Sequence, residues 1–137
     1  MRKNPLKAIW ARGGVAVSAW LSIPSSLAAE TLGHLGYDAA TLDLQHGMIS
    51  FAQALGMFQA LSATPAMPMA RLAGNAPTSI CRVLAAGAYS VICPLLSSAA
   101  EARAFVSASR HAPVGPPPYA PLRRPPSGGA PSLSHPH

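Results

Sequence analysis

Short apolar runs alternate with longer segments of helical period along most of this chain. The runs predict strands over Val15–Ile23, Ala39–Leu44, Met67–Leu72 and Tyr89–Pro94. The longer segments open near Ser, Thr or Asn, and Gly closes several of them, which is how helices begin and end. This alternation predicts an α/β fold with four consecutive strand-helix units, in which parallel strands are covered by helices.

Capping residues and helix breakers set the bounds of the expected helices. One helix precedes the first strand, between Asn4-Pro5 and Gly13-Gly14. The next opens at Pro24-Ser25-Ser26 and ends at Gly36, with Leu27, Leu32 and Leu35 on one face. Ser50 caps a third, which Pro65 stops and which runs through Ala52, Leu55, Phe58 and Leu61. A fourth ends at Ala86 before Gly87, and Ser98 with Glu101 forms a capping box for the last.

The composition changes after Arg110. Nine of the fifteen prolines fall between Pro113 and Pro136, and no acid occurs there. We therefore expect a folded domain over 1–110 and a disordered Pro-rich tail over 111–137, for which a shifted reading frame is one hypothesis. Pro116-Pro117-Pro118-Tyr119 matches the PPxY pattern of WW-module ligands, whereas the two imidazoles of His135-Pro136-His137 do not make a metal site.

The formal charge of +6 reflects missing acids as much as added bases, because ten Lys and Arg face only four Asp and Glu. No basic stripe interleaved with aromatic residues exists, so we predict no nucleic-acid binding.

No apolar run reaches the roughly 20 residues of a membrane helix. Cys81 and Cys93 form no CxxC pair and are interpreted as small buried hydrophobes in a reducing compartment.

The first residues imitate a secretory signal. Basic residues up to Arg12 precede the apolar stretch 15–23 and small residues at 25–29. The helix signals at Asn4-Pro5 and Gly13-Gly14 favour an ordinary helix and strand instead, so we predict a cytoplasmic protein and keep export as the alternative.

Candidate chemistry falls where the predicted strands end, at the edge where parallel folds place their sites. Trp20, Asp43-Gln45-His46 and Arg71 should converge there. His46 can act as a base near neutral pH with Asp43 orienting its ring, or it is a loop histidine bonded to backbone. Arg71 in an apolar strand needs a buried partner or an anionic ligand, or it reaches solvent; with so few acids, an external carboxylate is a reasonable partner.

Four motifs resemble the HpcH/HpaI aldolase and citrate lyase family in order and spacing, from about residue 5 to 110. They are Ala19-Trp20-Leu21-Ser22-Ile23-Pro24-Ser25, Leu42-Asp43-Leu44-Gln45-His46-Gly47, Ala70-Arg71-Leu72 and Val83-Leu84-Ala85-Ala86-Gly87-Ala88. The resemblance implies a TIM (β/α)8 barrel and a class II, metal-dependent pyruvate aldolase. Such an enzyme cleaves 4-hydroxy-2-keto or 2-keto-3-deoxy acids to pyruvate and an aldehyde.

The resemblance also implies a role for each candidate residue. His46 would be the base for the substrate hydroxyl with Asp43 in support, Arg71 would bind pyruvate and stabilise the enolate, and Trp20 would line the pocket. Gln45 departs from an acidic residue often found there. The divalent cation, Mg or Mn, would be held by a Glu and an Asp from later strands, and neither has a counterpart here because the last acid, Glu101, lies in a helix.

About four of eight barrel strands are predicted, so the chain corresponds to the first half of such an enzyme. We expect a truncated family member that is inactive alone, with unpaired strand edges that favour self-association. The alternative is a non-enzymatic interaction or small-ligand module that uses the half barrel as a scaffold.

Overall fold

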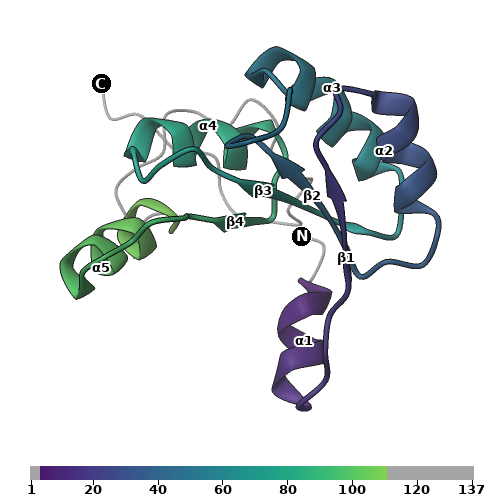
Figure 1. The fold of residues 1–137 in the computed structure, drawn as a ribbon. Helices are drawn as coiled ribbons and strands as arrows, with labels where there is room; N and C mark the ends of the chain where they lie inside the picture. The colour runs from purple at the N-terminus through teal and green to yellow at the C-terminus, as the bar shows by residue number, and fades with distance from the viewer. Residues whose placement is uncertain (1–3, 111–137) are drawn as a thin grey trace, which may run out of the picture.

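Residues 4–110, which the computed structural model describes, form one parallel sheet with helices around it (Figure 1). The strands are β1 (Ser18–Leu21), β2 (Ala39–Asp43), β3 (Met67–Arg71) and β4 (Ser90–Ile92), hydrogen-bonded in the order β1-β2-β3-β4. The helices are α1 (Pro5–Ala11), α2 (Ser26–Gly33), α3 (Phe51–Ser62), α4 (Pro77–Ala86) and α5 (Ala99–Ala108). The predicted strand-helix units and parallel pairing are confirmed. The predicted tail, its PPxY motif and its histidines lie outside the described residues.

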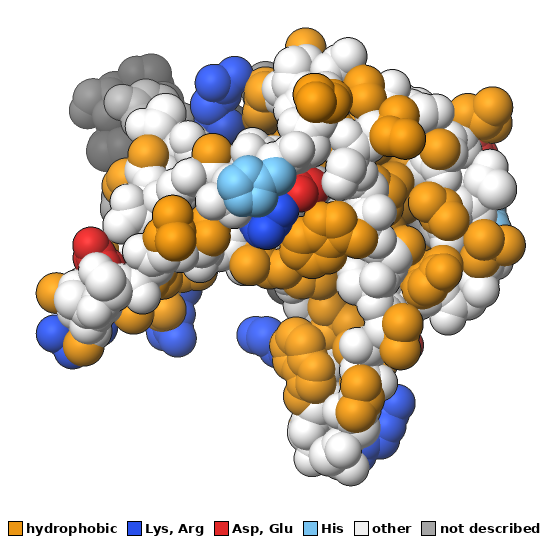
Figure 2. All heavy atoms as spheres, viewed as in Figure 1, with side chains coloured by type: hydrophobic (Ala, Val, Ile, Leu, Met, Phe, Trp, Pro, Cys, Tyr) orange, Lys and Arg blue, Asp and Glu red, His pale blue; other side chains and the backbone are white. Residues whose placement is uncertain are grey.

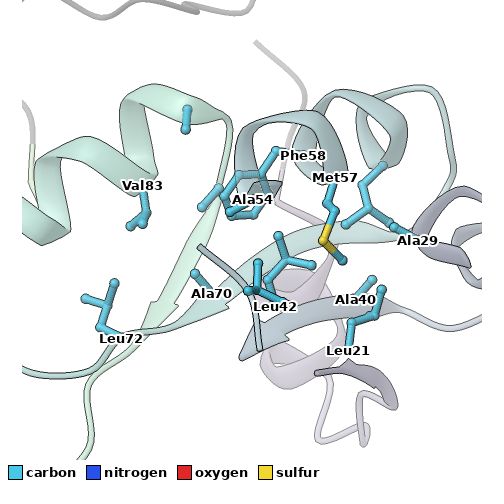
Figure 3. Packing of buried hydrophobic residues seen from close by; sticks show 14 of the residues in the cluster. Leu21, Ala29, Ala40, Leu42, Ala54, Met57, Phe58, Ala70, Leu72 and Val83 are labelled. Carbon is cyan, nitrogen blue, oxygen red and sulfur yellow. The ribbon is translucent and has the colours of Figure 1, made fainter. Parts of the chain in front are cut away.

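One face of the sheet packs against α2, α3 and α4. Alternate strand residues point to these helices, because side chains along a strand alternate between its two faces. Figure 3 shows Leu42 and Ala70 of the strands meeting Met57 and Phe58 of α3. Phe58 is 1% exposed, and this layer forms the main hydrophobic core.

Among the described residues, helix α1 covers the amino-terminal end of the opposite face. Leu6 and Ile9 of that helix are buried against Ala39 and Met67, which begin β2 and β3. The predicted cap is present, since the Asn4 side chain accepts a hydrogen bond from the Leu6 N–H. Asp43 and Arg71 each lie four residues after these contact residues, so they occupy the same face at its carboxyl end.

The first strand is shorter than its apolar run. Only Ser18–Leu21 pairs with β2, whereas a buried strand over 15–23 was expected. Val15 and Ile23 are 84% and 73% exposed. The apolar run continues beyond the point where a partner strand exists, and β1 is an edge strand, so the run overestimates both the length and the burial of the strand.

The expected apolar face of α2 is also corrected. Leu27 and Leu35 are 75% and 64% exposed, and only Leu32 of the three packs against the core. The buried residues are Ala29 and Gly33, because α2 lies close to the end of α3; a Cβ on Gly33 would lie 2.4 Å from Thr64 Oγ1. The helix ends at Gly33, three residues before the predicted Gly36.

The remaining elements follow their signals with smaller differences. Ser50 and Ser98 form capping boxes with Gln53 and Glu101, and α4 ends at Ala86 as predicted. In α3 the buried residues are Ala54, Met57, Phe58 and Leu61, while Ala52 is exposed and Leu55 half-buried. Strand β4 is three residues long, Ser90–Ile92, whereas the apolar run predicted a strand over Tyr89–Pro94.

The two cysteines are free and only half-buried, rather than buried as expected. Among residues 4–110 no helix is long and apolar enough to cross a membrane. The cytoplasmic location stays a prediction.

Candidate active site at the carboxyl ends of the strands

The carboxylate of Asp43 lies at the end of β2, and the residue is 2% exposed. Its Oδ1 accepts hydrogen bonds from Arg71 Nε at 2.9 Å and from the backbone N–H groups of Gln45 and His46 at 3.1 Å each. Its Oδ2 accepts from Arg71 Nη2 at 2.5 Å and from Trp20 Nε1 at 3.3 Å. These donors compensate the lost hydration of a charge that is otherwise costly to bury.

Arg71 ends β3 directly opposite Asp43 in the strand register. Its guanidinium pairs side-on with the carboxylate and lies over the ring of Trp20, with Cζ 5.0 Å from the ring centroid. A guanidinium has five N–H donors, and Asp43 engages the Nε and one Nη2 donor. The side chain is 23% exposed, so solvent reaches part of this group.

The ion pair sets the charge of both partners. The hydrogen bonds from Arg71 hold the pKa of Asp43 far below its usual range, with smaller contributions from the His46 and Gln45 N–H groups and from Trp20, although burial acts in the opposite direction. Asp43 in turn raises the pKa of Arg71. Near neutral pH Asp43 therefore stays an anion and is a poor proton donor or acceptor.

The loop after β2 is clamped against the ends of β1 and β2. A Cβ on Gly47 would lie 2.3 Å from the Asp43 carbonyl oxygen and 3.1 Å from the Ser22 Cα, so only glycine fits without displacement of backbone. The Met48 N–H donates to the Ser22 carbonyl at 2.8 Å. The His46 N–H donates to the Asp43 carboxylate, so the backbone of the loop is held on both sides of Gly47. The side chain of His46 is exposed.

The structure thus brings Trp20, Asp43 and Arg71 into contact and places the His46 backbone beside them. Figure 2 shows basic, acidic and histidine side chains gathered on this face. Two details differ from the expectation. The partner of Arg71 is Asp43 rather than an external carboxylate, and Asp43 bonds the backbone N–H of His46 rather than the ring that it was expected to orient. The clamp at Gly47 was not anticipated.

A divalent cation does not fit the described residues. Within 4–110 no cluster of three or more His, Cys, Asp or Glu side chains is placed to hold a metal ion. Asp43 lies at the rim of the sheet formed by the carboxyl ends of the strands, and it already accepts hydrogen bonds from Arg71, Trp20 and two backbone N–H groups. Any ion at this site would need ligands from elsewhere.

Comparison with known proteins places this geometry in context. Residues 17–116 match the family described as HpcH/HpaI aldolase/citrate lyase. The chain is 38% identical over 112 residues to a hydroxypyruvate/pyruvate aldolase from Rhizorhabdus wittichii, covering 82% of this chain and 45% of that protein. It is 32% identical over 113 residues to a 4-hydroxy-2-oxo-heptane-1,7-dioate aldolase of Salmonella dublin, covering 82% and 43%.

A solved structure gives the same result for the fold. An HpcH/HpaI aldolase/citrate lyase family protein from Burkholderia cenocepacia superimposes with a TM-score of 0.76 at 29% identity, covering 86% of this chain and 49% of that one. The chain therefore spans about half the length of the relatives that it matches. The expected α/β fold, part of a TIM-barrel-like architecture, is confirmed.

Proposed function

The chain belongs to the HpcH/HpaI aldolase/citrate lyase family, and on that premise we propose that its described residues form the 2-keto acid-binding half of an aldolase site. The reaction is a carbon–carbon lyase step, the reversible aldol cleavage of a 4-hydroxy-2-keto or 2-keto-3-deoxy acid to pyruvate and an aldehyde. The observation that carries the proposal is the Arg71 guanidinium, held at the rim by Asp43 and Trp20 and still partly exposed.

Arg71 binds the pyruvate end of the substrate. The side-on contact with Asp43 occupies Nε and one hydrogen of Nη2, which leaves Nη1 and the second Nη2 hydrogen for a ligand. Those donors match the planar fork that binds carboxylates and that stabilises an enolate oxygen as its charge develops. Because its pKa is raised, Arg71 keeps its charge throughout.

Asp43 and Trp20 are positioning residues in this proposal. Asp43 fixes the orientation of the guanidinium and, through its backbone contacts, the loop that carries His46. Trp20 supports the guanidinium from below by a cation–π contact and donates to the same carboxylate. Neither group moves a proton, since the carboxylate of Asp43 is fixed as an anion.

His46 is the base that takes the proton of the substrate hydroxyl. Its imidazole is exposed, and it lies on the loop whose backbone is bonded to Asp43, the partner of Arg71, so a substrate held by Arg71 can reach it. Gln45, where the family often has an acid, donates its backbone N–H to Asp43 and does not replace the base.

A bound Mg²⁺ or Mn²⁺ supplies polarisation of the ketone in this chemistry. Since residues 4–110 do not present a set of ligands for such an ion, we infer that these residues bind a 2-keto acid and do not turn over substrate by themselves.

Binding is tested by the fluorescence of Trp20, the tryptophan in contact with Arg71. In a Trp10→Phe background, the signal reports on Trp20 alone, because the chain has two tryptophans. Titration with pyruvate should change the emission, and Arg71→Lys should abolish the change because a single ammonium lacks the guanidinium fork. The matched control is Arg82→Lys, whose guanidinium lies over Phe51 instead. An unchanged signal in the parent, or equal loss in both variants, contradicts the role of Arg71.

Turnover is tested separately, as pyruvate release from a 4-hydroxy-2-keto acid with added Mn²⁺ or Mg²⁺. We expect no release above background. Release that His46→Ala abolishes would refute the predicted inactivity while supporting the base, and release that persists in His46→Ala would refute the base.

A further inference from the structure

The sheet has two open edges. Within residues 4–110, β1 pairs only with β2 and β4 pairs only with β3. All three pairings are parallel, so both edges run in the same direction. Unpaired N–H and C=O groups along an edge strand are a template for pairing with another chain.

Neither edge carries the charges that normally protect an edge strand. No residue between Arg12 and Glu30 is charged, and none between Arg82 and Glu101. These segments include β1 with its flanks and β4 with its flanks, and neither strand contains proline. Edges that remain in solvent usually carry lysine or proline, whereas paired edges do not need them.

Large apolar side chains are exposed beside both edges. Val15, Val17, Trp20 and Ile23 follow the β1 edge, each at least 48% exposed, and Leu95 and Val106 follow β4, at 87% and 45%. A groove of about 500 Å³ runs along β4, lined by residues that include Met69, Tyr89, Ile92 and Phe105. Figure 2 shows hydrophobic side chains in the deep notch between α1 and α5.

Among the described residues, helix α5 has a strand on only one side, β4. In strand-helix units a helix packs across its own strand and the next one, but β4 has no further neighbour among the described residues. Ala108 is the one fully buried residue of α5, while Phe105 is half-buried and Val106 exposed. The apolar side of this helix therefore needs a strand beyond β4.

We propose that a second copy of this chain covers these edges. A rotation of 180° about an axis parallel to the strands keeps every strand direction and brings β4 of one copy beside β1 of the other. The same rotation makes a second, identical β4–β1 contact, so the assembly closes at two copies. It contains eight parallel strands, the number of a closed (β/α)8 barrel, and α5 of each copy covers the partner's β1.

The length of a solved relative is relevant to this proposal. In the Burkholderia cenocepacia protein the matching part is 49% of the chain, so about as much chain again completes the fold. In the proposed assembly that place is taken by the second copy. The interface is independent of the aldolase chemistry, because it uses the edges of the sheet and leaves Asp43 and Arg71 in their intramolecular pair.

The first measurement is the mass of the chain in solution by sedimentation equilibrium. We expect a single species of twice the 14.0 kDa chain mass that dissociates on dilution. A monomer at all concentrations up to about 100 µM would overturn the proposal. A dimer with a dissociation constant above about 100 µM would be too weak to be a stable assembly. Open-ended oligomers would overturn it as well, because they indicate a contact that does not close.

Paired variants then test which edges meet. Val17→Lys charges the β1 edge and Val106→Glu charges α5, and both side chains are exposed in the single chain. Each variant alone should weaken the dimer at least tenfold, because both contacts are affected. Mixed in equal amounts, the two variants should dimerise again, because one contact then contains no substitution and the other joins opposite charges. Failure of the mixture to recover would overturn the β4–β1 arrangement.

The matched controls are Gln59→Lys and Gln59→Glu. Gln59 is exposed on α3, which covers the middle of the sheet and lies away from both edges. These variants should keep the dimer mass, and circular dichroism of every variant should match the parent. Loss of the dimer in the controls would contradict the proposed location of the interface.

Discussion

Removal of Arg71 should destabilise the chain more than neutralisation of Asp43, although the two residues form one ion pair. Arg71→Met leaves the carboxylate of Asp43 in a site that is 2% exposed. Three donors remain there, from Trp20, Gln45 and His46. Breaking a buried pair in this way costs about 3–5 kcal/mol. With these donors in place, we expect about 3 kcal/mol.

Asp43→Asn should cost less, about 1.5–2 kcal/mol, which is the lower part of the range for hydrogen bonds to charged groups. The amide oxygen can still accept from the backbone N–H groups of Gln45 and His46, and Arg71, which is 23% exposed, can turn toward water. The double variant should then be more stable than Arg71→Met alone, because no buried charge is left without its partner.

The assay is urea denaturation at pH 7, followed by circular dichroism at one protein concentration so that association contributes equally. At pH 4 the deficit of Arg71→Met should shrink, since without the guanidinium the pKa of Asp43 is no longer held down and the carboxyl can protonate. If Asp43→Asn costs as much as Arg71→Met, or if the two changes add, then the buried charge is not the source of the effect.

Three further predictions concern stability. The pKa of Asp43 is lowered in the folded chain and is about 3.9 when unfolded, so its contribution to the free energy of unfolding is present above about pH 4 and is lost as the pH falls below that. Free energies of unfolding measured between pH 7 and pH 2.5 should show this fall, and Asp43→Asn should make the fall smaller. Gly47→Ala should cost about 2 kcal/mol or more in urea denaturation because its Cβ meets the Asp43 carbonyl, whereas Gly74→Ala, with nothing within 4 Å, should be close to neutral. Phe58→Ala should cost about 3–5 kcal/mol in the same assay, and a cost below 1 kcal/mol would mean that the core relaxes around the lost ring.

The alternation of strand and helix periods was sufficient to predict the elements, because each unit carries its own local signals. Ser50 and Ser98 cap their helices within a few residues of sequence, and Gly87 ends α4 with φ of 122°. The lengths of β1 and the apolar face of α2 were not predictable in this way. The length of β1 depends on where its pairing with β2 stops, and the buried face of α2 depends on how closely α3 approaches it. Both are features of the tertiary structure.

The position of the candidate site could be predicted from the sequence, but the hydrogen bonds and the ion pair within it could not. Trp20, Asp43 and Arg71 each lie near the end of an apolar run, which is a local signal. The ion pair between Asp43 and Arg71 forms because the register of β2 with β3 places the two residues opposite each other. A single sequence does not show this register. Gly47 beside His46 was visible as a turn residue, yet its close approach to the Asp43 carbonyl arises only when β1 and β2 lie side by side.

The order of strands in the sheet is also their order in the chain, and this bears on how the chain is made. Each strand emerging from a ribosome finds its neighbour already synthesised, so the sheet can grow by one unit at a time. Helix α1 is the exception. It is made first, but its contacts include Met67 and the Asn4 hydrogen bond to Ser90, 86 residues later. The first helix to be synthesised therefore completes its contacts only after residues as late as Ser90 have been made.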